Sequence, residues 1–365
     1  MQTIFCPKET SSGENRAATV PKVVAKFCSL GLSVLVEKAI GKKIGIADDE
    51  YFSAGANVVD GFRAGASEAD VVIGVKCPAH EKIVKIKRGA THISFLDRNI
   101  HHAEVEAFTS AGVSMISLGM IPRIAVAQKF DALSSQASLA GYAAVLMAAT
   151  HTSTAFPMMM TPAGTIHPAN VFVVGIGVAG LQAIATAKRL GARVEAFDPR
   201  PETEEQARSL GAKFLKIEIG ETRQTKQGYA RELTEEQIQK QRLAMISACN
   251  RADVVITTAK VFGGKAPILV TKEMLDEIDT KTLFVDMAVA AGGNVEGSVG
   301  GKLTICNGHI KVLGISEAEQ LVAYTASQVF AENMYNFVEH FYDRETKRII
   351  FSPTDAIISK CLLKI

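Results

Sequence analysis

The chain contains 365 residues, with 40 Lys and Arg against 38 Asp and Glu, so its formal net charge is +2. At roughly 150 residues per domain, this length predicts two domains or three. The evenly mixed charge lacks the basic face that phosphate binding requires, so we expect no nucleic-acid partner. Hydrophobic residues make up 47% of the chain and charged residues 21%, which excludes an intrinsically disordered protein.

The sequence shows no signal of a secreted or membrane-spanning protein. Its most apolar stretch, 137–160, is interrupted by Tyr142, His151 and Pro157, so we expect no membrane span. No basic region followed by an apolar one opens the chain, so no secretory signal is expected. The six cysteines form no CxxC pair, which argues against a metal site and predicts reduced thiols. We therefore expect a soluble protein of a reducing compartment.

The first half of the chain alternates short apolar runs with amphipathic stretches, as in parallel α/β layers. Its strands are predicted at residues 3–6, 33–36, 70–75, 90–95 and 113–116. A helix is predicted over 21–30, because apolar residues recur on one face and Gly31 follows as a stop. Residues 131–154 predict one long helix that links the two halves and ends before Pro157.

The second half repeats this rhythm. Its strands are predicted at residues 170–175, 193–198, 253–258, 282–287 and 309–313. Helices are predicted over 181–190 and 202–210, and a capping box at Thr234–Gln237 opens another. Residues 316–341 show a continuous helical pattern, which we expect to pack back on the first half.

Together these patterns predict an α/β fold of two Rossmann-like, doubly wound parallel-sheet domains joined by long helices. The first domain is expected to be discontinuous and Rossmann-like or flavodoxin-like, and to comprise residues 1–133 plus 316–365. The second is expected to comprise residues 134–315 and to carry the dinucleotide site described next.

The segment Gly175-Ile-Gly-Val-Ala-Gly180 follows the first strand of the second half and opens a helix. In that context a GxGxxG pattern predicts a dinucleotide site, whereas alone it is a weak signal. Gly175 permits the tight turn, Gly177 lets the backbone approach a diphosphate, and Gly180 allows close helix packing. Amides at the helix start, including those of Val178 and Ala179, would then bind the diphosphate. A glycine-rich turn without a ligand is the plainer alternative.

Asp198 ends the next predicted strand, where a carboxylate would accept a hydrogen bond from the adenosine ribose. A 2′-phosphate would be repelled there, so NAD(H) is favoured over NADP(H). Arg200 is a counterweight, because an arginine near this position can hold a 2′-phosphate. We therefore count Asp198, Pro199 and Arg200 among the expected cofactor contacts.

A second group of polar residues precedes the long helix and comprises Arg123, Gln128, Asp131 and Ser134. Their spacing would suit a set of donors and acceptors that reads a carboxamide. Asp131 or Ser134 could equally cap the helix, and the two roles can coexist.

One segment, 220–232, is polar throughout except for Tyr229, so it has no face to bury. A solvated surface loop is one interpretation of this pattern. The other is a mobile lid whose single aromatic side chain closes over a ligand.

These residues resemble the NAD(H)-binding domain I, or alpha subunit, of the proton-translocating nicotinamide nucleotide transhydrogenases. The resemblance runs from Pro7-Lys-Glu to near Phe341 and is most specific at 123–142, 157–191 and Ala291-Gly-Gly-Asn. It implies a catalytic set around the nicotinamide, completed by a tyrosine of a mobile loop: Arg123, Gln128, Asp131, Ser134 and Tyr229. It also implies further cofactor contacts from Gly228, Gln241, Thr258 and Ala259.

The chain also resembles alanine dehydrogenase, a family of related fold. Arg16 and Lys76 match basic residues that hold its oxo-acid substrate, but its catalytic histidine falls at Asp97 and its catalytic aspartate at Ala290. Oxidative deamination requires a proton acceptor, and a neutral alanine cannot serve as one. The chain also departs from the transhydrogenase pattern, because Ala290 replaces an acidic residue and 315–320 lacks an Asn-x-Pro-Ser turn. Arg16 and Lys76 would then pair with acidic neighbours across the cleft.

The resemblance implies reversible hydride transfer between NADH, bound here, and NADP+ held by a separate component, with proton movement through a membrane component. The expected partners are the membrane-spanning and NADP(H)-binding transhydrogenase components and a second copy of the chain in a homodimer. The expected location is the cytoplasmic face of a bacterial inner membrane, or the matrix side in a mitochondrion. Two alternatives stay open: an alanine dehydrogenase-like oxidoreductase and a non-catalytic NAD-binding protein.

Overall fold

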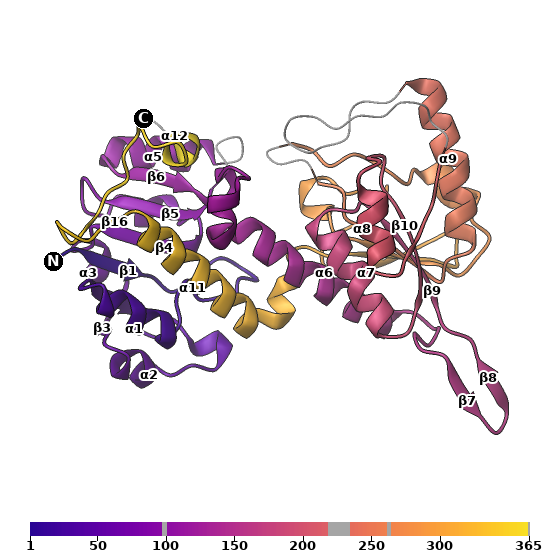
Figure 1. Cartoon of the computed structure of the whole chain (residues 1–365), viewed down its shortest axis with the longest axis horizontal. Helices are drawn as coiled ribbons and strands as arrows, with labels where there is room; N and C mark the ends of the chain where they lie inside the picture. The colour runs from indigo at the N-terminus through magenta and orange to yellow at the C-terminus, as the bar shows by residue number, and fades with distance from the viewer. Residues whose placement is uncertain (97–100, 218–233, 261–263, 364–365) are drawn as a thin grey trace. The chain divides into compact units, whose positions relative to one another are not determined.

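The computed structural model describes residues 1–96, 101–217, 234–260 and 264–363. The chain divides into two compact units, Met1–Gln136 with Val322–Ile365, and Ala137–Leu321. Each unit is built on a seven-stranded sheet (Figure 1). The predicted fold class, two doubly wound and mostly parallel sheets with a discontinuous first unit, is confirmed.

The sheet of the first unit has the strand order β18-β6-β5-β4-β1-β2-β3, and only the edge strand β18 is antiparallel to its neighbour. Its strands are β1 (Thr3–Cys6), β2 (Ser33–Glu37), β3 (Asn57–Val59), β4 (Val71–Lys76), β5 (Thr91–Phe95), β6 (Ser114–Ser117) and β18 (Leu362–Leu363). Its helices are α1 (Pro21–Ser29), α2 (Asp48–Ser53), α3 (Phe62–Ala66), α4 (His80–Ile83), α5 (His102–Ala111), α11 (Ala323–His340) and α12 (Ile358–Cys361). A short pair, β16 (Tyr342–Asp343) and β17 (Arg348–Ile349), follows α11.

Successive strand residues face opposite sides of this sheet, and each side has its own core. Phe27 of α1 and Phe337 of α11 belong to one buried cluster, with Ile4, Ile73 and other residues of the sheet. A second buried cluster joins Phe62 of α3 and Phe108 of α5. The predicted C-terminal helix therefore packs on the first half of the chain.

The sheet of the second unit has the order β11-β10-β9-β12-β13-β15-β14, with β14 as its antiparallel edge strand. Its strands are β9 (Asn170–Val174), β10 (Arg193–Phe197), β11 (Lys213–Phe214), β12 (Val254–Thr257), β13 (Leu283–Asp286), β14 (Leu303–Cys306) and β15 (Ile310–Gly314). Its helices are α7 (Val178–Arg189), α8 (Thr203–Ser209), α9 (Glu235–Asn250) and α10 (Lys272–Asp276). The predicted capping box is present, with Thr234 Oγ1 accepting from the Gln237 N–H at 3.4 Å.

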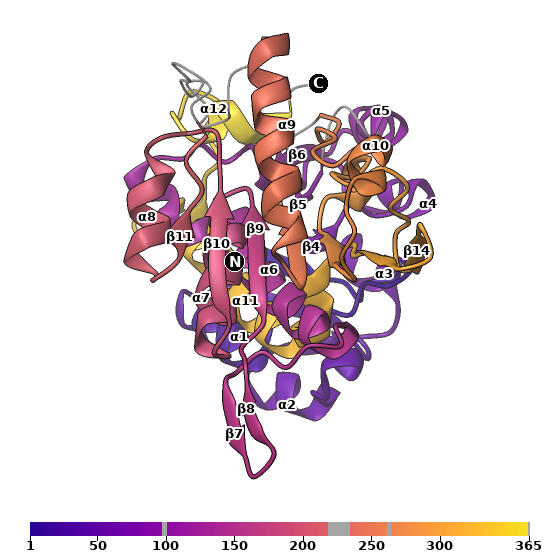
Figure 2. The same ribbon diagram turned by 90° about the vertical axis from the view of Figure 1, so that its right-hand side faces the viewer.

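Helices α7 and α9 cover opposite faces of this sheet (Figure 2). Ala183 and Ile184 of α7 belong to one buried cluster, whereas Met245 and Cys249 of α9 belong to the other. A hairpin of β7 (Met159–Thr161) and β8 (Gly164–Ile166) projects from the rest of the unit, and its strand residues are all exposed (Figures 1 and 2).

The long helix α6 (Ala132–His151) confirms the predicted linking helix. Within the described residues it is long and apolar enough to cross a membrane by length and composition, with a mean hydropathy of 1.2. The sequence did not predict this, because the apolar stretch at 137–160 begins later and includes Pro157. Ala143, Ala144 and Ala148 of α6 lie in the buried core of the second unit, as expected of a core helix.

Candidate functional site

The turn between β9 and α7 has the geometry that the GxGxxG spacing predicts. Gly175 has a φ of +96°, a conformation that side chains rarely adopt. A Cβ on Gly180 would lie 1.9 Å from the Gly175 carbonyl oxygen, so α7 can approach the turn only because this position has no side chain. A Cβ on Gly177 would meet no heavy atom within 4 Å in the described structure. Space beside Gly177 is therefore available to a ligand that approaches the backbone.

This turn lies where the chain reverses its direction of travel across the sheet. β9 is flanked on one side by β10, the next strand in sequence, and on the other by β12, from which the chain continues to β13, β14 and β15 on that side of the sheet. Thr258 directly follows β12, and its hydroxyl donates to the Gly175 carbonyl oxygen at 2.8 Å. Open α/β sheets bind ligands at this kind of crevice, and the amino end of α7 favours negatively charged phosphate groups there.

Asp198 directly follows β10 and is only 6% exposed. Its Oδ2 accepts the Ile176 N–H at 2.7 Å, which fixes the middle of the glycine turn. Arg200 donates its Nε and Nη2 to the two carboxylate oxygens, both at 2.8 Å, and its Nη2 also reaches the Ile176 carbonyl oxygen at 3.1 Å. The two residues that sequence reasoning set against each other thus form one ion pair on the turn.

Sequence reasoning missed Asn294, which supports the same site from β13's side. Its Oδ1 accepts the Ala259 N–H at 3.0 Å, and its Nδ2 donates to the carbonyl oxygens of Ala259 and Pro267, both at 2.8 Å. Asp286, buried at the end of β13, accepts the Asn294 N–H at 2.9 Å. The only sequence signal was the Gly-Gly-Asn stretch itself, since its partners lie 27 to 35 residues away.

The first unit holds the four residues expected around a nicotinamide. Asp131 Oδ1 accepts the Ser134 N–H at 2.9 Å and its Oδ2 accepts the Ser134 hydroxyl at 2.6 Å, so Asp131 caps the start of α6. Gln128 lies in the 3-10 helix η3 (Ala125–Phe130), and both it and Arg123 are exposed. The structure brings Asp131 and Ser134 together, and contact of the four residues with a nicotinamide stays a prediction.

The remaining residues singled out from the sequence lie on other elements or outside the described residues. Gln241 of α9 donates its Nε2 to Met245 Sδ at 3.6 Å, while its buried Oε1 has no hydrogen-bond partner in the described part of the chain. Val178 and Ala179 open α7, and Pro199 follows Asp198. Gly228, Tyr229 and Asp97 lie outside the described residues. Ala290 lies in the 3-10 helix η4 (Val289–Ala291), and the departure at 315–320 leads into η5 (Ala318–Val322).

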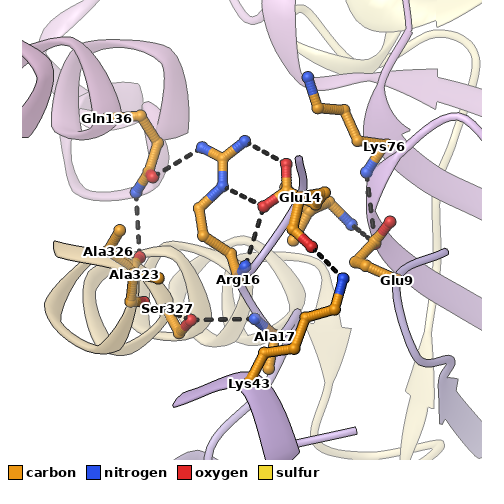
Figure 3. Close-up of polar contacts among 11 residues, drawn as sticks. Glu9, Glu14, Arg16, Ala17, Lys43, Lys76, Gln136, Ala323, Ala326 and Ser327 are labelled. Carbon is orange, nitrogen blue, oxygen red and sulfur yellow. Dashed lines mark hydrogen bonds and ion pairs between the residues drawn. The ribbon is translucent and has the colours of Figure 1, made fainter. Parts of the chain in front are cut away.

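Arg16 and Lys76 differ in their surroundings within the first unit (Figure 3). Arg16 is 3% exposed, and Glu14 accepts hydrogen bonds from two of its side-chain nitrogens at 2.7 and 2.8 Å. Gln136 Oε1 accepts one from the third at 2.9 Å. The acidic neighbour expected for Arg16 therefore comes from its own loop. The backbone N–H of Lys76 donates to Glu9 at 3.3 Å, while its side chain extends away from that carboxylate.

Two family descriptions match nearly the whole chain. The alanine dehydrogenase/PNT N-terminal domain matches residues 5–140, and the alanine dehydrogenase/PNT C-terminal domain matches residues 144–364. An NAD(P) transhydrogenase alpha subunit of Rhodospirillum rubrum is 42% identical over 363 residues, which cover 98% of this chain and 94% of that protein.

Two further proteins place the chain within this group. The crystal structure of transhydrogenase from Sinorhizobium meliloti has a TM-score of 0.89 and 39% identity, and the match covers 99% of this chain and 98% of that one. Alanine dehydrogenase of Mycobacterium tuberculosis is 28% identical over 295 residues, which cover 80% of this chain and 74% of that protein.

Proposed function

The chain belongs to the alanine dehydrogenase/PNT family, and on that basis we propose that it is the NAD(H)-binding component of a transhydrogenase. The observation that carries this proposal is the 42% identity to a transhydrogenase alpha subunit over almost the full length of both proteins. The identity to an alanine dehydrogenase is lower, 28%, and covers less of the chain. The reaction would be reversible hydride transfer between NADH bound here and NADP+ held by a partner component.

The second unit offers the features that an NAD(H) site needs. The open space beside Gly177 and the amino end of α7 suit a diphosphate. Asp198 would accept from a ribose hydroxyl in place of Arg200, which bonds both carboxylate oxygens in this structure. Asn294 accepts the Ala259 N–H and Thr258 donates to the Gly175 carbonyl oxygen, so both fix the backbone around this crevice. When bound, the nicotinamide supplies the hydride chemistry, and the protein supplies orientation and exclusion of water.

The residues of the first unit would position the reacting ring. Gln128 and Arg123 are exposed, so they are accessible to a carboxamide. Asp131 and Ser134 are bonded to each other at the start of α6 and would hold that end of the helix in place beneath them. Tyr229 would shield the ring from water when a partner docks, as the family resemblance implies.

The proposed partners are the membrane-spanning and NADP(H)-binding components of the transhydrogenase, at the cytoplasmic face of a bacterial inner membrane or the matrix side of a mitochondrial one.

A second copy of this chain is the further proposed partner. The projecting β7–β8 hairpin supports it, because Met158, Met160 and Ile166 are 61%, 84% and 39% exposed. Two-stranded hairpins are marginally stable alone, so one that projects gains from a partner surface. Deletion of residues 159–166 should therefore convert a dimer into a monomer, as measured by sedimentation in an analytical ultracentrifuge.

Alanine dehydrogenase activity is the weaker candidate. Ala290 would leave no proton acceptor where that family has an aspartate, and Arg16 is already bonded to Glu14 and Gln136. A non-catalytic NAD-binding protein would bind NADH but exchange no hydride even beside a partner.

The decisive experiment combines this chain, NADH, an oxidised NAD analogue and a purified NADP(H)-binding transhydrogenase domain with its nucleotide. Hydride exchange that requires both proteins supports the proposal. Consumption of NADH by this chain alone with pyruvate and ammonia would refute it in favour of a dehydrogenase.

The positioning role of Gln128 has its own test in the same assay. Gln128→Asn should slow exchange about a hundredfold, because a misplacement of about 1 Å has that effect, and should leave NADH affinity within a few-fold. Gln206→Asn, at an exposed position of α8, is the matched control. Equal exchange rates in the two variants would contradict the role of Gln128.

A further inference from the structure

The first unit contains a pocket that the proposed reaction does not use. Its volume is about 270 Å³, and it is lined by residues that follow β1, by the end of β4 and the residues after it, and by Phe62 and His92. β1 and β4 are neighbours in the sheet, yet the chain runs from β1 towards β2 and β3 and from β4 towards β5 and β6, on opposite sides. The pocket therefore lies at the switch point of the first sheet, where α/β folds bind ligands.

This pocket adjoins the surroundings of Arg16, because Lys76 and Glu9 line it and Arg16 acts electrostatically on Glu9, but it lies on another face of the sheet. Phe62 belongs to the buried cluster on the α3 and α5 side of the sheet, and His92 stacks on Phe108 of the same cluster with ring centroids 5.1 Å apart. Ala17, next to Arg16, belongs to the cluster on the α1 and α11 side. Successive strand residues face opposite sides, so the two groups lie on different faces of the sheet.

Gly74 lines this pocket and has no side chain to fill it. It lies inside β4, at an irregularity where the pairing with β5 shifts between Ile73 and Lys76. A Cβ at this position would lie 3.5 Å from Glu9 Oε1 and 3.6 Å from His92 Cε1. Glycine inside a strand commonly marks a bulge or the close approach of another group, and here it leaves the space between a carboxyl and an imidazole empty of side chain.

His92 lines the pocket and has an unused hydrogen-bonding atom. The residue is 1% exposed, and its Nδ1 has no hydrogen-bond partner in the described structure. Burial lowers the pKa of the imidazole to about 3, so the ring is neutral at physiological pH. Buried polar atoms are nearly always paired, and this one therefore indicates a missing partner.

The neighbouring serine determines what kind of partner is missing. His92 Nε2 lies 2.9 Å from Ser94 Oγ, and Ser94 is fully buried. Among the described residues this nitrogen is the only partner of the Ser94 hydroxyl. If Nε2 donated, the buried hydroxyl hydrogen would have no acceptor, so we assign the hydroxyl as the donor and Nε2 as the acceptor. A neutral ring that accepts at Nε2 carries its proton on Nδ1. The unused atom is thus a donor, and it requires an acceptor.

The rim of the pocket is rich in cations. Lys8, Lys76 and Lys82 line it, against Glu9 and Glu81. The Lys82 Nζ lies 3.0 Å from Thr10 Oγ1 and 5.1 Å from the centre of the Phe62 ring, both of which also line the pocket. Burial raises the pKa of Glu9 to about 7, which reduces its negative charge near neutral pH.

We propose that this switch-point pocket binds a small oxyanion, with the His92 Nδ1–H and the Lys82 ammonium as its donors and Gly74 as the opening that admits it. Phosphate and carboxylate share this chemistry, and both accept charge-assisted hydrogen bonds. The proposal concerns the first unit alone and does not depend on NAD(H) binding in the second.

The test is calorimetric titration of the full chain with inorganic phosphate and, separately, with malonate, at an ionic strength matched with chloride. Saturable binding of either anion, weakened about tenfold by Lys82→Gln, is the expected result, since a hydrogen bond to a charged group contributes that much or more. Lys85→Gln, an exposed lysine outside the pocket, is the matched control and should stay within about twofold of the parent.

A second variant separates the pocket from simple attraction to lysines. His92→Phe keeps a ring against Phe108 but removes the donor, and circular dichroism checks that the variant folds. It should weaken the anion as Lys82→Gln does. Neither anion binding more than chloride, or equal affinity in Lys82→Gln and Lys85→Gln, would overturn the proposal. Binding of phosphate alone or of malonate alone would identify the source of the oxyanion.

Discussion

Replacing Asn294 by alanine should destabilise the second unit and empty its nucleotide site. The side chain is fully buried and makes three hydrogen bonds to the backbone, two with Ala259 and one with Pro267. Alanine leaves one N–H and two carbonyl groups without these partners. At about 1–2 kcal/mol for each group, the free energy of unfolding falls by about 3–6 kcal/mol. That is a large fraction of the roughly 5–15 kcal/mol typical of a domain.

Asn250→Ala is the matched control. Asn250, at the end of α9, also accepts a backbone N–H, that of Asp279 at 3.0 Å, and donates to a carbonyl oxygen, that of Glu277 at 3.3 Å. These contacts are exposed, so water replaces them, and we expect a loss under about 1 kcal/mol. The two variants thus remove the same chemistry at different burial.

The assay is thermal unfolding followed by circular dichroism, together with NADH binding followed by fluorescence. Asn294→Ala should lower the midpoint by about 6–24 °C, since about 1 kcal/mol corresponds to about 2–4 °C for a unit of this size. It should also weaken NADH by at least about tenfold, because Ala259 no longer has a fixed place beside the glycine turn. Equal midpoints in Asn294→Ala and Asn250→Ala would refute the reasoning.

Three further predictions concern the turn and the buried histidine. Gly177→Ala should fold with parental stability, because its Cβ meets open space, yet lose NADH affinity at least about tenfold, because that space is where the ligand approaches. Gly180→Ala should lose stability, because its Cβ meets the Gly175 carbonyl oxygen, and equal melting temperatures of the two variants would contradict this. Asp198→Asn should weaken NADH more than NADPH, and an equal loss for both in titrations would argue against a ribose contact. Burial lowers the pKa of His92 from 6.5 to about 3, so in acid the imidazole gains a proton when the protein unfolds. The contribution of the neutral, buried ring to the free energy of unfolding is therefore complete above pH 6.5 and decreases below it, by about 2 kcal/mol at pH 5. His92→Phe should flatten the acid limb of the stability profile, and an unchanged limb would contradict the assignment.

Local patterns predicted the central strands of both sheets, but not β3, β11, β14 or β18. The strand at 170–174, the turn that begins at Gly175 and the capping box at Thr234 each depend on residues close together in sequence, where turn and cap chemistry is legible. The β7–β8 hairpin was missed because its residues show no alternation of apolar and polar side chains and were interpreted only as the end of a helix.

The site was only partly predictable, for a related reason. Asp198 was found because its place after a strand is a local signal, but its ion pair with Arg200 on the Ile176 turn was not. Asn294 was missed because its partners are backbone groups of distant segments, which leave no mark of residue type. The pairing of Asp131 with Ser134 at the start of α6 was one of two roles left open, and the structure shows that capping role.

The discontinuity of the first unit has a consequence for synthesis on the ribosome. The second unit is continuous in sequence, so it can fold as soon as residue 321 has emerged. The first unit cannot, because Phe330 and Phe337 of α11 complete a core begun by Ile4 and Phe27. At about 5–20 residues per second, the first 136 residues wait about 10–40 seconds for α11 while the second unit is made. During that interval their apolar surface is exposed, and α11, which is translated after the second unit, is the segment that covers it.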